Sequence, residues 1–367
     1  MDPIAEARSL AEAAFRPDTT EDELAGKASR VMGSLAGPAD LRMADVAAAL
    51  APAIRSAPSR AAAVAATVVG YMCERGADPG AAGPALVERM LAAVQGADRL
   101  RAAAVARLSA APEKGRDPGD DSGAMLAAID GLRAEMPSDS REWDLLNRLL
   151  PAGNAMFGVS PNLRASAVSA LPGLGRLEDV HDSAGWLKTM ILVLDQEPFV
   201  AIEPATGLGI AGRISGISVN FQLNVLLMDA FPQTGFMRHR RVSRQAVEVA
   251  RGDGPQQSGE TITGVWDLCA WTAIRSDGAL VRAADQEATR HWIWNEGRPV
   301  DIPVFEGARM IILAPPSYGR TWNCTRDFAY LKADMKVDRS LSKSEVGELI
   351  ARMAASSRSA TAAGSRR

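Results

Sequence analysis

The sequence predicts an α+β protein. An N-terminal all-α helical bundle, or a short helical-repeat region, precedes an α+β domain with a mainly antiparallel sheet. Two shifts along the chain support this fold class. Up to residue 121 the only aromatic residues are Phe15 and Tyr71, and apolar residues recur at spacings of three and four. All seven tryptophans come later, and β-type patterns begin only near Pro198.

The first part of the chain is typical of successive helices separated by Gly or Pro. Thr20 and Glu23 form a capping box, in which each side chain accepts a hydrogen bond from a free backbone N–H of the first turn. The pattern contains no repeated signature, so it indicates a bundle or short stack without naming a repeat family. The expected helices cover residues 4–15, 20–35, 39–54, 58–73, 84–94 and 98–108.

Domain boundaries follow from composition. Residues 113–122 are charged, contain Gly and Pro, and have almost no apolar side chain, which predicts a linker. It ends a helical bundle over residues 1–112 and precedes a joining helical segment over 123–197, with helices at 123–135, 140–150, 162–171 and 177–194. The α+β domain is expected over residues 198–355, and a small, polar and basic tail over 356–367 is expected to be disordered.

Within the α+β domain the sequence predicts a hairpin, short helices and several strands. Residues 198–203 and 209–217 flank a turn, and Ser276-Asp277-Gly278 is a second turn signal. Strand and helix do not alternate, so a parallel nucleotide-binding sheet is not expected. Further strands are expected at 261–274, 279–282, 291–295 and 309–314, and helices at 221–231, at 242–250 and from the capping box Ser342–Glu345 to Ala355.

Charge and cysteine content exclude several classes of protein. A net charge of −3 removes the electrostatic attraction expected of a nucleic-acid binder. No apolar run reaches the roughly 18 residues that a membrane span needs, and the first residues lack the pattern of a secretory signal. The three cysteines, Cys73, Cys269 and Cys324, are scattered. The sequence therefore predicts a cytoplasmic protein without disulfides, with neither a membrane nor a nucleic-acid partner.

Two motif types are too weak to predict a cofactor or a metal. Residues 207–212 match GxGxxG in letters, but they lie in a predicted hairpin, whereas a dinucleotide site needs a strand that opens into a helix. His181, His239 and His291 do not pair with each other or with Cys at metal-ligand spacing. No cofactor and no metal are predicted.

The tryptophan-rich end supplies the leading functional hypothesis. Trp266 and Trp292 are expected in the core, whereas other rings are expected to wall a groove for an extended peptide, with a strand edge adding main-chain pairing. The protein is then a non-catalytic adaptor or accessory protein, and its helical part mediates assembly, with a homo-oligomer as one form. The predicted partner-binding residues are Trp294, Trp322, Tyr318 and Arg320.

A cysteine-dependent hydrolase or transferase is the first alternative. Cys324 lies in a predicted loop with nearby Arg residues, which lower a thiol pKa. His291 is the one His in this half of the domain and would act as base, oriented by Glu296 or Asp327. No local signature supports this constellation.

Phosphate or RNA binding is the second alternative. The densest basic run of the chain lies between the two predicted helices near residues 231 and 242, and Arg forks suit phosphate and carboxylate partners. A solvated loop leading into a helix explains the same residues. The run contributes Arg238, His239, Arg240, Arg241 and Arg244.

Overall fold

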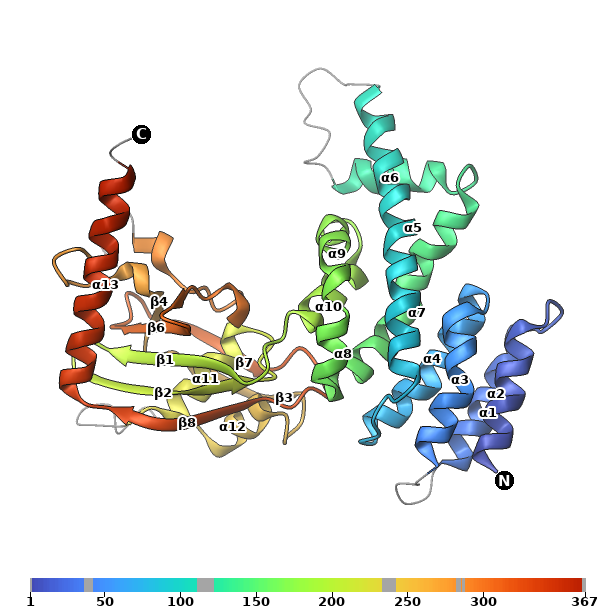
Figure 1. The fold of residues 1–367 in the computed structure, drawn as a ribbon, viewed down its shortest axis with the longest axis horizontal. Helices are drawn as coiled ribbons and strands as arrows, with labels where there is room; N and C mark the ends of the chain where they lie inside the picture. Colours follow the sequence, from blue (N-terminus) through green and yellow to red (C-terminus); the bar gives the residue numbers. More distant parts are fainter. Residues whose placement is uncertain are drawn as a thin grey trace. The chain divides into compact units, whose positions relative to one another are not determined.

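The computed structural model describes residues 2–35, 42–110, 122–232, 242–281, 285 and 288–364. The chain forms two compact units, Met1–Leu192 and Val193–Arg367. Helices make up the first unit, and the second combines helices with a mixed, mostly antiparallel sheet (Figure 1). The predicted α+β fold class is therefore confirmed.

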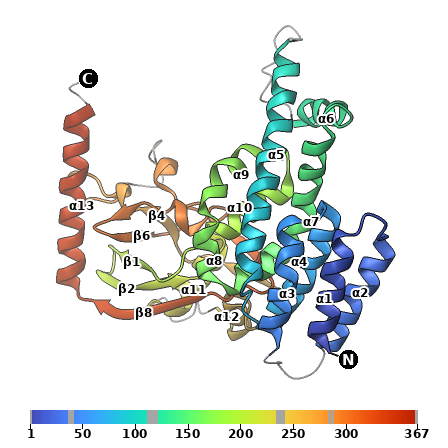
Figure 2. The ribbon, with the colours of Figure 1, turned by 45° about the vertical axis from the view of Figure 1, so that its right-hand side comes forward.

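In the first unit α7 is the central helix, because it packs against both α4 and α5. Figures 1 and 2 show α5 and α7 side by side. The helices α6, α7, α8 and α9, which follow the predicted linker, pack against α5, which precedes it, while residues 113–121 of that linker lie outside the described residues. The helices are α1 (Pro3–Phe15), α2 (Glu21–Ser34), α3 (Met43–Ser56), α4 (Ser59–Glu74), α5 (Ala82–Ala110), α6 (Ser122–Leu132), α7 (Pro137–Val159), α8 (Pro161–Ser166), α9 (Leu171–Leu177) and α10 (Asp182–Ile191).

The prediction of two helices between residues 84 and 108 is wrong, because α5 continues through Gly96. A Cβ at Gly96 would lie 2.6 Å from Cβ of Glu142 on α7. This glycine therefore permits close approach of two helices and does not end one of them. Gly70 plays the same part between α4 and α7, where a Cβ would meet Cα of Ala152 at 2.9 Å.

The sheet of the second unit has the strand order β4-β6-β1-β2-β8, and β5 also pairs with β6. β1 and β2 form the predicted hairpin, while β1 and β6 are parallel. A separate two-stranded sheet joins β3 and β7. The strands are β1 (Glu197–Glu203), β2 (Leu208–Ser215), β3 (Gln257–Thr263), β4 (Asp267–Ala270), β5 (Val304–Phe305), β6 (Ala308–Ala314), β7 (Thr321–Thr325) and β8 (Asp334–Leu341).

Both faces of the larger sheet are buried. Phe199 of β1 packs in one core cluster with Leu226 of α11 (Asn220–Ala230). Ile202 of the same strand belongs to a second cluster with Met353 of α13 (Lys343–Gly364). Because side chains alternate along a strand, α11 and α13 cover opposite faces and the unit has three layers. α12 (Arg244–Arg251) packs beside α11.

The glycines of residues 207–212 serve the hairpin. Gly207 has φ +71° in the turn between β1 and β2. A Cβ at Gly212 would lie 2.0 Å from the main-chain oxygen of Lys336, at the point where the β2–β8 register shifts. These positions need glycine for turn geometry and for close strand approach.

Three strand predictions are wrong. Residues 261–274 divide between β3, β4 and a 3-10 turn, and segments 279–282 and 291–295 contribute only isolated bridges in their described residues. β7 and β8 come from segments in which no strand was predicted. β8 is an outermost strand with mostly exposed side chains, so its pattern carries little apolar periodicity.

The last helix begins as predicted and ends later. Ser342 and Glu345 make reciprocal capping bonds, with Ser342 N–H donating to Glu345 Oε2 at 2.7 Å and Glu345 N–H donating to Ser342 Oγ at 3.3 Å. The backbone of α13 stays helical to Gly364, beyond Ser356, where the disordered tail was predicted to begin. Tertiary bonds extend the helix, because Ser357 and Arg358 donate to main-chain oxygens of the 274–276 turn.

Candidate functional site

Three aromatic side chains meet at the surface of the second unit. Trp294 and Tyr318 are 50% and 53% exposed, and the half-buried Trp292 contacts both. The Trp292 ring centroid lies 5.2 Å from that of Trp294 and 6.3 Å from that of Tyr318. We call Trp292, Trp294 and Tyr318 the aromatic surface. Large exposed rings in mutual contact are typical of binding surfaces.

The Arg320 side chain packs against two rings of the aromatic surface, those of Trp292 and Tyr318. Its guanidinium carbon lies 4.8 Å from the Trp292 ring centroid and 4.6 Å from that of Tyr318. The side chain is only 11% exposed. Arginine stacks well on aromatic faces because its delocalised cation is weakly hydrated. Arg320 thus holds the two rings in a fixed arrangement.

Asp267 provides the counter-charge for Arg320. It begins β4, and its side chain is 3% exposed. Its Oδ1 lies 3.6 Å from Nε of Arg320, while its Oδ2 accepts a 2.8 Å hydrogen bond from the Ser317 N–H. The carboxylate therefore positions both Arg320 and the loop that carries Tyr318.

A cavity of about 320 Å³ lies next to the aromatic surface. Trp292 forms part of its wall, and most of its lining is apolar. Cavities of this size accept a large side chain or a small ligand. The polar groups that reach it are Asp267, Cys269, His291 and Ser317.

The backbone at Trp294 is held by the start of α11. Asn220 Nδ2 donates to the Trp294 main-chain oxygen at 2.8 Å, and the Gly297 N–H donates to the same oxygen at 3.0 Å. In return, Asn295 O accepts the N–H of Phe221 at 2.9 Å. The backbone that carries the exposed Trp294 indole is therefore held in place by hydrogen bonds. The segment 291–295 does not form the strand that was predicted for it.

Trp322 does not join the aromatic surface. It is 9% exposed and belongs to a core cluster, and its ring centroid lies 5.5 Å from that of the partly buried Phe221. The segment 321–325, predicted as a loop, is the strand β7, whose alternation turns Trp322 and Cys324 inward. Trp266 is buried as predicted, with its indole N–H donating to Glu203 Oε1 at 2.9 Å. The prediction that Trp292 lies in the core is wrong, because this ring is half-buried and contacts the exposed rings of Trp294 and Tyr318.

The residues of the cysteine hypothesis have separate surroundings. Cys324 is buried, its Sγ donates to Ala246 O at 3.6 Å, and burial raises the pKa of its thiol. His291 Nδ1 instead contacts Thr272 Oγ1 at 2.9 Å. No hydrogen bond joins Cys324 to His291 in the described part of the chain. Nucleophilic thiols have lowered pKa values, so this environment does not favour a nucleophile.

In the described part of the chain, no hydrogen bond or ion pair joins His291 to Glu296 or Asp327, the two carboxylates proposed to orient it. Glu296 is exposed. Asp327 Oδ2 accepts a 3.0 Å hydrogen bond from Ser218 Oγ, and burial raises the pKa of Asp327. The Asp327 carboxylate therefore belongs to an interior hydrogen-bond network.

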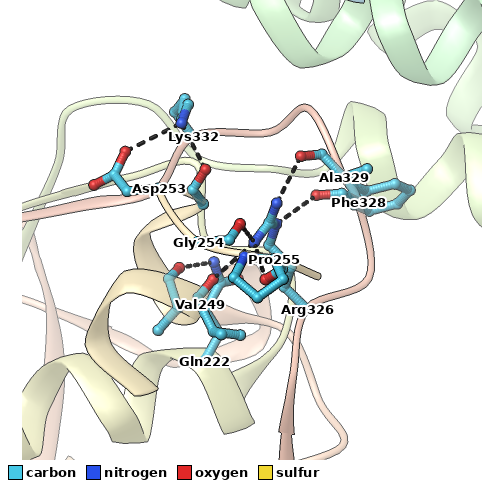
Figure 3. A network of polar contacts seen from close by, with 11 residues as sticks. Gln222, Val249, Asp253, Gly254, Pro255, Arg326, Phe328, Ala329 and Lys332 are labelled. Atoms are coloured by element: carbon cyan, nitrogen blue, oxygen red, sulfur yellow. Dashed lines mark hydrogen bonds and ion pairs between the residues drawn. The ribbon is translucent and has the colours of Figure 1, made fainter. Parts of the chain in front are cut away.

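Arg326, next to Asp327, connects two loops (Figure 3). Its buried guanidinium donates to five main-chain oxygens, and the shortest of these bonds, 2.7 Å, goes to Pro255. Burial lowers the pKa of Arg326. A fixed fork that is saturated by carbonyls has a structural role. The accepting residues are Val249, Gly254, Pro255, Phe328 and Ala329.

The basic run of the phosphate hypothesis falls mostly outside the described residues. This applies to Arg238, His239, Arg240 and Arg241. Arg244 is described, is 92% exposed, and pairs with Glu248 at 2.9 Å. An exposed pair of this kind within one helix is a common surface feature.

Sequence reasoning missed Asp267 and Asn220, which position the site. Asn220 is 1% exposed, and a weak signal existed in the alternation of Ser218, Asn220, Gln222 and Asn224 at the start of an otherwise apolar helix. Buried amides need partners, so such a run points to a helix end that holds another segment. Asp267 has no comparable signal, because its partners Ser317 and Arg320 lie far away in sequence.

Within the described residues, no group of three His, Cys, Asp or Glu side chains is placed to hold a metal ion. No helix in the same ranges combines the length and the apolar character that a membrane crossing requires. Comparisons of the chain with protein-family models, with curated proteins and with solved structures find no significant match.

Proposed function

We propose that the second unit binds an extended, uncharged segment of a partner protein at the aromatic surface. An apolar side chain of that segment occupies the adjacent cavity. The observation that carries this proposal is the contact of two half-exposed rings, Trp294 and Tyr318, with Trp292, which also lines a cavity of about 320 Å³.

The energetics of aromatic side chains support a binding role. Buried Trp and Tyr rings remove about 150–250 Å² each from water, and they dominate the affinity of protein interfaces. Trp294 and Tyr318 leave about half of their surface available for this. Removal of such a residue from the centre of an interface costs about 2 kcal/mol or more.

The rings are also arranged before a partner arrives. Asn220 and Gly297 fix the backbone of Trp294, and Arg320 packs against Trp292 and Tyr318. Binding therefore orders few side chains of this protein. Preorganisation increases affinity because less conformational entropy is lost on association.

Side-chain packing, more than strand pairing, suits this site. The open edge of β4 is already occupied, because the Ile293 N–H donates to Leu268 O at 2.8 Å. The Arg320–Asp267 pair has no net charge, and the cavity lining is mainly apolar. A neutral segment with one large apolar residue matches these properties.

The experiment is selection of binders from a displayed library of random peptides on the full-length protein. The double variant W294A/Y318A should lose nearly all selected peptides, while Y330A, which removes an exposed ring outside the aromatic surface, should retain them. Circular dichroism of both variants verifies the fold. Retention of the same peptides by a folded W294A/Y318A protein would refute the proposal.

A further inference from the structure

The guanidinium of Arg320 lacks hydrogen-bond acceptors. Nε and Nη2 are enclosed and have none, and its contact with Asp267, at 3.6 Å, is too long for a hydrogen bond. Across the described residues, no acceptor is found for the third nitrogen, Nη1, and the Arg320 side chain keeps 11% of its surface exposed. Charged donors without acceptors are costly in a buried setting. Nη1 of Arg320 is thus available to an oxygen atom of a bound molecule.

The charge of Asp267 determines whether a neutral or a negatively charged oxygen of a ligand can bind at Arg320 Nη1. Its carboxylate is buried, and its Oδ1 lies on the Nε side of the guanidinium without any hydrogen bond. The positive charge of Arg320 is therefore balanced before a ligand binds. A ligand carboxylate at Nη1 would face the negative charge of Asp267 in a poorly hydrated region, where Coulomb repulsion is weakly screened.

We infer that Arg320 binds a neutral carbonyl oxygen of the partner segment, and that Asp267 is the specificity residue that excludes carboxylates. The carbonyl is that of an Asn or Gln side chain of the segment. This inference rests on the proposed peptide-binding function of the aromatic surface. It adds the charge preference of that surface, which the rings alone do not set.

The test uses peptides selected on the wild-type protein, synthesised in matched pairs that differ only by Gln or Glu, or by Asn or Asp, at each position in turn. Affinities are measured for wild type and for D267N, in which the amide oxygen can still accept the Ser317 N–H. For at least one position, wild type should bind the amide peptide about tenfold more tightly. In D267N this preference should reverse toward the acidic peptide, and the acidic affinity should fall as salt is added.

The measured quantity is a ratio within one protein, so a general loss of stability does not alter it. If D267N does not fold, D267S removes the same charge and is scored in the same way. A wild-type preference for acidic peptides, or an identical ratio in wild type and variant, overturns the role of Asp267. If the peptides depend on Trp294 and Tyr318 but show either of these two results, the role of Asp267 is refuted and the proposed function is still supported. If no peptide depends on those rings, the proposed function fails and the inference fails with it.

Discussion

Asn220 Nδ2 donates a 2.8 Å hydrogen bond to the main-chain oxygen of Trp294. An almost fully buried amide thereby fixes the backbone beneath one of the most exposed large rings of the second unit. The start of α11 and the segment 294–297 are 74 residues apart in sequence at this bond, and it joins them into one structure.

We therefore expect Asn220→Ala to lower the free energy of unfolding by about 0.5–1.5 kcal/mol, because the variant removes one hydrogen bond to the Trp294 main-chain oxygen, which keeps the Gly297 N–H as donor. Urea denaturation followed by tryptophan fluorescence measures this, since five of the seven tryptophans lie in the second unit. Asn323→Ala, at an exposed position of β7, is the matched control. Equal effects of the two substitutions would contradict the anchoring role of Asn220.

The three thiols should be unreactive in the native protein. Burial raises the pKa of Cys73 and Cys269 to about 12, and it also raises that of Cys324. At pH 7.5 we expect Ellman's reagent to label native Cys73 and Cys269 roughly a thousandfold more slowly than in the chain unfolded in guanidinium, as their thiolate fractions require, and to label native Cys324 more slowly than unfolded Cys324. Rapid labelling of one native thiol, lost in Cys324→Ser, would instead support the cysteine hypothesis.

The same thiols should make the free energy of unfolding depend on pH in the alkaline range. Their folded-state pKa values lie above the ordinary value of 9.0. The stabilisation that comes from these protonated thiols is fully present below about pH 9 and is lost as the pH rises toward 12. The reason is that the thiols of the unfolded chain lose their protons at a lower pH than those of the folded chain. Urea midpoints measured between pH 8 and pH 10.5 should fall, and Cys269→Ala should reduce the slope. An unchanged slope in Cys269→Ala would exclude this thiol as a source.

Asp327 should lower stability at neutral pH. Its pKa is raised by burial above 3.8, so its contribution to stability is complete below about pH 3.8 and is lost as the pH rises through the folded-state pKa. Asp327→Asn keeps an acceptor for the Ser218 hydroxyl and cannot ionise. We expect the variant to gain stability over wild type at pH 7 and to lose this gain at pH 3. Asp334→Asn, at an exposed position, serves as control, and a gain independent of pH would argue against burial as the cause.

Arg326 should be among the most sensitive positions of the second unit. Arg326→Met removes the five hydrogen bonds that this guanidinium donates to main-chain oxygens and should cost at least about 3 kcal/mol, because each bond to a charged group contributes about 1.5–3 kcal/mol. Arg326→Lys retains the charge without the planar fork and should cost less. Arg244→Met removes an exposed guanidinium and should change stability by at most about 0.5 kcal/mol. Comparable losses for Arg326→Met and Arg244→Met would show that the network contributes little.

Local signals in the sequence were sufficient where one segment decides its own conformation. The helix-capping pair Ser342–Glu345 and the hairpin joining β1 to β2 lie where the sequence predicts them. The same kind of reasoning failed at Gly96, because a glycine that ends a helix and one that permits close packing look alike in sequence. It also failed at β8, whose side chains face solvent and show no alternating pattern.

For the candidate site, the sequence alone indicated that the tryptophan-rich end holds large rings, and that Trp294, Tyr318 and Arg320 belong to one region. Only the tertiary structure decided that Trp322 lies in the core while Trp294 stays exposed, and that Asp267 lies beside Arg320. The physical reason is that composition and periodicity report on neighbours within one element. Burial and charge pairing depend instead on strand register and on contacts between residues about 50 positions apart, as Asp267 and Ser317 are.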